Sequence, residues 1–257
     1  MSSTTARSLM YCILALGMAG MFLTLHAAKA DATLPDDMAG HMTMTKLRPA
    51  QPGDQERADT IAVAARKFAE RYVDYKKALA EGYTIFAPEV PQHVYHFTLD
   101  AAAIANEFKF DPNRPTSLLY EKTANKDADG KPGYKLVGVM YTAPYRSSEE
   151  ALDERVPLSV AQWHLHTNLC LPPRGEQVDV TAADAKFGLR GAITTAEACR
   201  AAGGRFMPHL FGWMVHVYPF ETDKAKVWAA GMDDDHGMQH DAMPGMKMDP
   251  NMQMGPM

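Results

Sequence analysis

The segments LSVAQWHLHTNL (158–169) and FGWMVHVYPF (211–220) decide the expected fold, because both are rich in the β-branched and aromatic residues that favour strands. QHVYHFTL (92–99) has a similar composition. SLLYEKT (117–123) and YKLVGVMYTA (134–143) flank a turn-rich stretch, which predicts a hairpin with a long loop. Strands interleaved with a few helices predict an α+β fold with a largely antiparallel sheet.

One long helix is expected ahead of these strands, at residues 54–80. Apolar residues recur there near the 3.6-residue period, and Gly82 follows as a plausible C-cap; the apolar positions are Ile61, Ala65, Phe68, Tyr72, Tyr75 and Leu79. Short helices are expected at 147–154, capped by Ser147 or Ser148, and from Thr194 or Thr195 to residue 202.

Residues 1–30 have the pattern of a signal peptide. Arg7 precedes an apolar run at 9–25, and Ala28-Lys29-Ala30 forms a small-x-small cleavage motif. An uncleaved membrane anchor is the alternative, but the apolar run is short for a span. The sequence therefore predicts a periplasmic or secreted protein that has no membrane contact after cleavage at Asp31.

The rest of the chain divides into three parts. Residues 31–55 contain Pro, Gly, Asp, Met and His without periodicity and are expected to be a flexible lead-in; 56–230 are expected to form a single α+β domain; and 231–257 are expected to be a disordered Met/His/Asp-rich tail. The net charge of −5 and the lack of a dense Lys/Arg block argue against a nucleic-acid partner.

Cys170 and Cys199 are the two cysteines that remain after the predicted cleavage. An even count in an oxidising compartment favours a disulfide, which would constrain the unfolded chain by roughly 3 to 4 kcal/mol. A thiolate metal site is the alternative.

The histidines of the body fall into three aromatic-rich segments. They are His93 and His96, His164 and His166, and His209 and His216. On a strand, the period of two puts His164, His166 and Asn168 on one face. Imidazole nitrogen suits copper, zinc and iron, so the three pairs predict a metal site of unknown metal identity. Hydrogen-bonded structural histidines are the rival interpretation.

The tail carries a second candidate metal site. Thioether sulfur selects Cu(I), while imidazole and carboxylate take Cu(II), so the tail composition predicts copper binding. The candidate ligands are His236, His240, Met238, Met243, Met246 and Met248. A disordered segment that scavenges oxidants or docks to a partner is the alternative.

Two resemblances add to this interpretation. MPGMKM and NMQM in the tail resemble the Met/His-rich segments of periplasmic copper-resistance proteins, which implies copper handling but no particular fold. The motifs ALAEGY, HVYHF, WHLHTNLC and GWMVHVYPFE resemble exported bacterial proteins of uncharacterised function, a likeness that implies no mechanism.

Together these features predict a periplasmic copper-binding protein that sequesters the metal or delivers it to a periplasmic metal-handling partner. A cupin-like, metal-dependent oxidoreductase using His164, His166 and His216 is the enzymatic alternative. A third interpretation has the tail as the sole metal site on an interaction domain. No catalytic residue is predicted, because the chain lacks GxSxG, HExxH, a P-loop and a Gly-rich dinucleotide turn.

Overall fold

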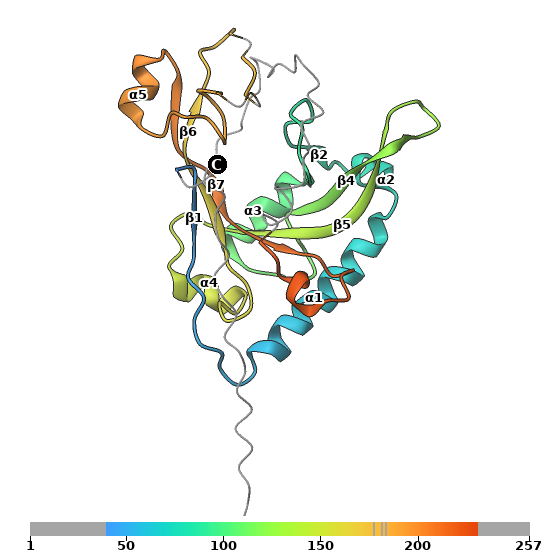
Figure 1. The fold of residues 1–257 in the computed structure, drawn as a ribbon. Helices are drawn as coiled ribbons and strands as arrows, with labels where there is room; N and C mark the ends of the chain where they lie inside the picture. The colour runs from blue at the N-terminus through green and yellow to red at the C-terminus, as the bar shows by residue number, and fades with distance from the viewer. Residues whose placement is uncertain (1–39, 177, 181, 183, 231–257) are drawn as a thin grey trace, which may run out of the picture.

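The structure, a computed structural model, describes residues 40–176, 178–180, 182 and 184–230 (Figure 1). Within these residues the chain forms an antiparallel seven-stranded sheet in the order β1-β6-β7-β5-β4-β3-β2. The strands are β1 Met42–Met44, β2 Thr84–Ile85, β3 Tyr95–Thr98, β4 Ser117–Lys126, β5 Pro132–Ala143, β6 His164–Leu171 and β7 Arg205–Val217. The expected α+β class with an antiparallel sheet is confirmed.

Helices in the described residues are few and mostly short. They are α1 Asp54–Ala69, the 3-10 helix η2 Glu70–Tyr72, α2 Tyr75–Ala80, α3 Asp100–Phe108, α4 Glu149–Arg155, α5 Ala196–Ala201 and α6 Lys224–Val227. Ser148 caps α4 and Thr195 caps α5 through their side chains, as expected. No helix in the described ranges combines the length and apolarity that a membrane span requires.

The main hydrophobic core lies between one face of the sheet and α1. Ile61, Ala65 and Phe68 on α1 are buried with strand residues such as Phe97 and Val217. In Figure 1 the long β4–β5 hairpin extends to the right, and the β6–β7 ladder with α5 rises at the upper left. Because side chains alternate along a strand, the neighbours of Phe97 and Val217 face the other side of the sheet.

The single helix expected at 54–80 is interrupted. It divides into α1, η2 and α2, because Asp74 adopts an extended backbone conformation and its side chain accepts a hydrogen bond from the Lys76 amide, which starts a new helix. Of the expected apolar stripe, Leu79 alone is exposed, at 40%. The break keeps both Tyr72 and Tyr75 buried beneath the sheet.

α3 and the start of β6 also differ from expectation. The sequence pattern did not predict α3, whose buried residues are Ala102 and Asn106, too small and too polar to give an apolar stripe. β6 begins at His164 rather than at 158, because residues 157–161 form turns in which the amides of Val160 and Ala161 bond to the Pro157 carbonyl.

From residue 42 the lead-in, which the sequence predicts to be flexible, forms an edge strand of the sheet. β1 pairs with β6 at the sheet edge, with Met42 opposite His166 and Met44 opposite His164. His41 is 1% exposed. Three residues are too few to show a hydrophobic period in the sequence. The strand forms because its backbone pairs with the edge of the sheet at β6.

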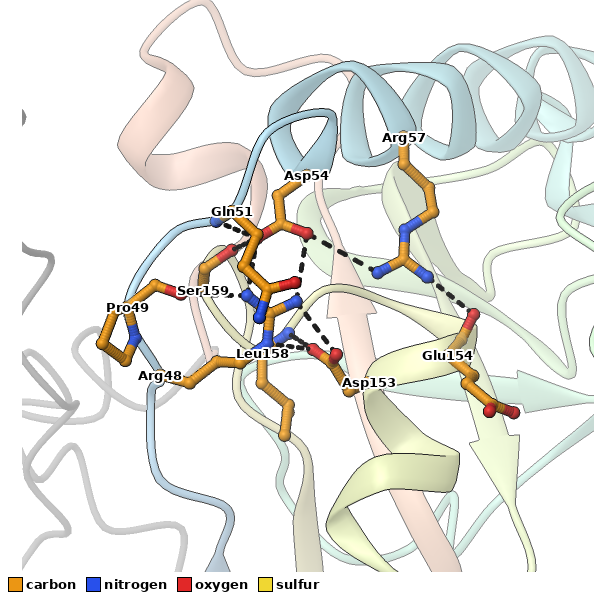
Figure 2. Close-up of polar contacts among 9 residues, drawn as sticks. All are labelled: Arg48, Pro49, Gln51, Asp54, Arg57, Asp153, Glu154, Leu158 and Ser159. Atoms are coloured by element: carbon orange, nitrogen blue, oxygen red, sulfur yellow. Dashed lines mark hydrogen bonds and ion pairs between the residues drawn. The ribbon is translucent and has the colours of Figure 1, made fainter.

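An ion-pair network then fixes the lead-in to the body (Figure 2). The Arg48 guanidinium lies between two carboxylates: it donates to Asp54 at 2.6 and 3.0 Å and to Asp153 at 2.8 and 2.9 Å. Asp54 also accepts hydrogen bonds from the Ser159 hydroxyl and from the backbone N–H of Gln51. Arg48 thereby joins the lead-in to α1 and α4, which lie apart in the sequence.

Cys170 and Cys199 form a disulfide with a Cα–Cα distance of 5.6 Å, as predicted. Both are fully buried, and the bond joins β6 to α5. Gly204 packs beside it, where an added Cβ would lie 2.7 Å from the Cys170 sulfur. The disulfide occupies both sulfurs, so the alternative of a thiolate metal site does not apply.

Candidate metal centre

Four histidines from three strands converge on the face of the sheet opposite the main core. They are His96 on β3, His164 and His166 on β6, and His216 on β7. His96 stands between the core residues Tyr95 and Phe97, and His216 stands between Val215 and Val217. Strand alternation therefore directs both rings to the second face.

The four rings form a continuous chain of contacts. Ring centroids lie 5.3 Å apart for His96 and His216, 4.9 Å for His216 and His164, and 5.5 Å for His164 and His166. The Nε2 atoms of His96 and His216 are 3.3 Å apart. The Tyr218 hydroxyl lies 3.5 Å from Nδ1 of His216.

The approach of His96 to His216 depends on the shape of the sheet. β5 and β4 separate β7 from β3, and three strand spacings in a flat sheet amount to about 14 Å. Gly138 on β5 allows β5 and β7 to approach closely, since an added Cβ would lie 2.4 Å from the Val217 carbonyl oxygen. A register shift after Leu119 interrupts the β4–β5 pairing nearby, and such irregularities bend a strand.

Burial keeps these histidines neutral. His164 and His216 are 4% and 9% exposed. Burial, followed by the charge of His166, lowers the pKa of His96 to about 4, and burial also lowers the pKa of His166 to about 4. For His164 and His216 burial is again the main cause, and it holds the pKa well below its usual value. Neutral imidazole is the form that binds a metal.

Two ring nitrogens of the cluster are buried without a hydrogen-bond partner, namely Nδ1 of His164 and Nδ1 of His166. A polar atom buried without a partner costs about 1–3 kcal/mol, so such atoms are uncommon. Within the described residues, no three His, Cys, Asp or Glu side chains already stand in the arrangement of a formed metal site. The cluster is therefore a set of close, neutral imidazoles rather than a closed coordination shell.

The other predicted ligands of the body lie elsewhere. His93 is exposed and precedes β3. The His209 ring stacks on Tyr145 at a centroid distance of 4.0 Å, and its Nδ1 lies 3.1 Å from the Phe211 carbonyl oxygen. The structure thus brings together one histidine from each outer pair and both from the central pair.

Asn168 does not extend the cluster, although the strand period predicted that it would share the face of His164 and His166. Its backbone is left-handed, with φ 56°, and its side-chain amide donates to the Gly40 carbonyl at 3.1 Å. His41 has a similar structural role: its ring nitrogens lie 3.1 and 2.5 Å from the carbonyl oxygens of Asn168 and Gly191. Both residues fix the lead-in to β6.

The predicted signal peptide and the predicted tail ligands lie outside the described residues. The last described residue, Ala230, packs with Met42 and Met44. Its backbone also lies next to the ring of His216. The described part of the chain therefore ends beside the histidine cluster.

The fold and the cluster together define an α+β protein that holds four imidazoles on one face of an antiparallel sheet, with His164 and His216 buried and His96 and His166 partly buried. Comparison with protein-family models, curated proteins and solved structures gave no match. The assignment of a function therefore depends on the chemistry of the cluster and of the tail.

Proposed function

We propose that this protein binds a transition metal, copper in the first place, at a site formed by His96, His164, His166 and His216. The observation that carries the proposal is the 3.3 Å separation of the Nε2 atoms of His96 and His216. Two nitrogen ligands about 2.05 Å from a tetrahedral ion lie about 3.3 Å apart. The pair thus has the spacing of two ligands that share one ion.

A purely structural cluster explains the geometry less well. A hydrogen bond between the Nε2 atoms of His96 and His216, at 3.3 Å, accounts for that one contact and leaves the rest of the cluster unexplained. The unpartnered Nδ1 atoms of His164 and His166 add a desolvation cost that no contact in the cluster offsets. A bound cation would give ring nitrogens of the cluster a partner, because neutral imidazole is a ligand for copper, zinc and iron.

The tail supports copper among these metals. Eight methionines lie between Gly231 and the C-terminus, together with His236 and His240, and thioether sulfur favours Cu(I). Ala230, the residue that precedes the tail in the sequence, lies beside the cluster. This arrangement fits a protein that captures copper with the tail and holds it, or passes it on, at the folded site.

In the same proposal, the protein acts in the periplasm. The apolar run and the small-x-small motif before Asp31 support export. The Cys170–Cys199 disulfide supports an oxidising compartment, since such bonds are rare in the cytosol.

The experiment must separate the folded site from the tail without removing any part of the chain. In a tail-substituted chain, Ser replaces the eight methionines that follow Gly231, and Gln replaces His236 and His240. This chain is titrated with Cu(I), Cu(II) and Zn(II), alone and with His216→Asn or the control His209→Asn.

We expect the tail-substituted chain to bind about one equivalent of metal. His216→Asn should abolish this binding, whereas His209→Asn should retain it because His209 stacks on Tyr145 outside the cluster. Circular dichroism shows whether each variant is folded. A folded tail-substituted chain that binds none of the three ions would refute the folded site.

A further inference from the structure

Several cluster histidines have a methionine as the paired residue on a neighbouring strand. Met42 on β1 lies opposite His166, and Met44 on β1 lies opposite His164. On the other side of β6, His164 pairs with Met214 of β7. His216 pairs in turn with Met140 of β5. Each cluster histidine on β6 and β7 thus has a methionine as a direct cross-strand partner.

Cross-strand partners point to the same face of a sheet, with Cα atoms about 4.5–5.5 Å apart. The thioethers of these methionines are therefore on the face of the imidazoles. Packing agrees with this placement. Met140 and Met214 form a small cluster with Leu119 and Tyr218, and Tyr218 contacts His216. Met42 and Met44 pack on Ala230, whose backbone lies next to the ring of His216.

Chance does not readily explain this pattern. The described residues contain five methionines, and four of them are partners of cluster histidines. The fifth, Met207, pairs with Leu169 and packs in a separate apolar cluster. If only hydrophobic packing were required, Leu, Ile or Val would serve equally well, and such residues occupy the opposite face of the sheet.

We infer that the folded site selects Cu(I), with thioether sulfur from Met44 or Met214 completing an imidazole set centred on His164. The inference rests on the proposed function and names the metal and two further ligands. We place His164 at the centre of the site because it has a methionine partner on each neighbouring strand and a buried Nδ1 without a hydrogen-bond partner.

Ligand softness gives the physical basis for selectivity. Thioether sulfur is soft and polarizable, so it binds Cu(I) well, whereas Zn(II) sites use imidazole, carboxylate and thiolate. The disulfide leaves no thiolate at Cys170 or Cys199. Loss of the methionine sulfurs should therefore weaken Cu(I) binding and leave Zn(II) binding at the histidines nearly unchanged.

The test uses the full-length tail-substituted chain, so that copper bound by the tail does not hide the folded site. The double variant Met44→Leu/Met214→Leu removes the sulfurs but conserves side-chain volume, and Met207→Leu is the matched control. Cu(I) affinity is measured anaerobically by competition with a chromophoric chelator, and Zn(II) affinity by a fluorescent indicator. Copper K-edge absorption reports sulfur in the coordination shell.

Loss of outer-shell partners already weakens metal sites by about tenfold or more, and loss of direct ligands should cost at least as much Cu(I) affinity. We expect this loss in the double variant, together with loss of the sulfur signal, while Zn(II) affinity and the Met207→Leu control stay unchanged. The double variant could instead keep its Cu(I) affinity while His216→Asn still abolishes binding. That result would refute the methionine ligands but not the histidine site. A tail-substituted chain that binds neither ion would overturn both proposals.

Discussion

The Nε2 atoms of His96 and His216 are 3.3 Å apart although β4 and β5 lie between their strands. Leu119 pairs with both His96 on β3 and Gly138 on β5, so Gly138 lies in the same cross-strand row as His96. The absence of a side chain at Gly138 lets β7 approach β5, and this approach brings His216 towards His96. A backbone position without chemistry of its own thus controls the geometry of the candidate site.

Gly138→Ala should disturb both stability and metal binding. The new Cβ would meet the Val217 carbonyl oxygen at 2.4 Å, so β5 and β7 must separate, at a cost of about 1–3 kcal/mol in the free energy of unfolding. Lys135→Ala, at an exposed position of the same strand, is the control. Chemical denaturation and metal titration measure the two effects, and wild-type values for both in Gly138→Ala would contradict this role.

Arg48→Met should destabilise the protein by about 2–4 kcal/mol. The change removes the cation that pairs with Asp54 and Asp153. The largely buried Asp54 carboxylate, which is 8% exposed, then keeps only its longer ion pair with Arg57, at 3.8 Å. Arg66→Met is the matched control, since Arg66 and Glu70 are both 53% exposed and such pairs contribute less than about 1 kcal/mol. Urea denaturation of both variants gives the comparison, and equal effects would show that the Arg48 network has no special role.

Acid should weaken the protein partly through Asp54. The hydrogen bonds from Arg48 hold the pKa of Asp54 well below its usual value, which is about 3.9 in an unfolded chain. Because the folded pKa is the lower one, the stabilisation is complete above about pH 4 and is lost as pH falls towards the folded pKa. Asp54→Asn should remove this part of the decline between about pH 4 and 2. Denaturation curves at several pH values measure it, and parallel declines in wild type and variant would disprove it.

Breaking the disulfide should lower stability without removing the histidine cluster. Cys170 and Cys199 are separated by 29 positions, so their cross-link contributes about 3–4 kcal/mol in the chain-entropy model. The double variant Cys170→Ser/Cys199→Ser should unfold at lower denaturant concentration and should not respond to dithiothreitol, unlike the wild type. A wild-type midpoint that dithiothreitol leaves unchanged would argue against the bond in solution.

The sequence predicted the larger features of the body for clear physical reasons. Alternating and β-branched residues indicated β4, β5, β6 and β7, and the turn-rich stretch between the first two indicated their hairpin. The period of two on β6 also predicted that His164 and His166 share a face, and their rings are in contact. Local patterns were sufficient there because strand alternation and turn propensity are properties of adjacent residues.

Other features had no local signal. Met42–Met44 became a strand because β6 offers an edge for pairing, and Arg48 is important because two acidic residues distant from each other in sequence converge on it. In the sequence the six body histidines appear as three similar pairs, each in a short aromatic-rich segment. The choice of His96 over His93, and of His216 over His209, depends on where each strand begins and on the unusual backbone at Phe211, with φ 60°.

The sequence by itself determined the α+β class, the antiparallel hairpin and the cysteine pair, because each follows from residue types at short spacing or from a count. Tertiary structure alone decided which histidines meet and which methionines stand beside them. That decision depends on strand order, register and the close approach that Gly138 permits between β5 and β7. These are relationships among residues far apart in the sequence, such as His96 and His216 at a separation of 120 positions, and no local pattern encodes them.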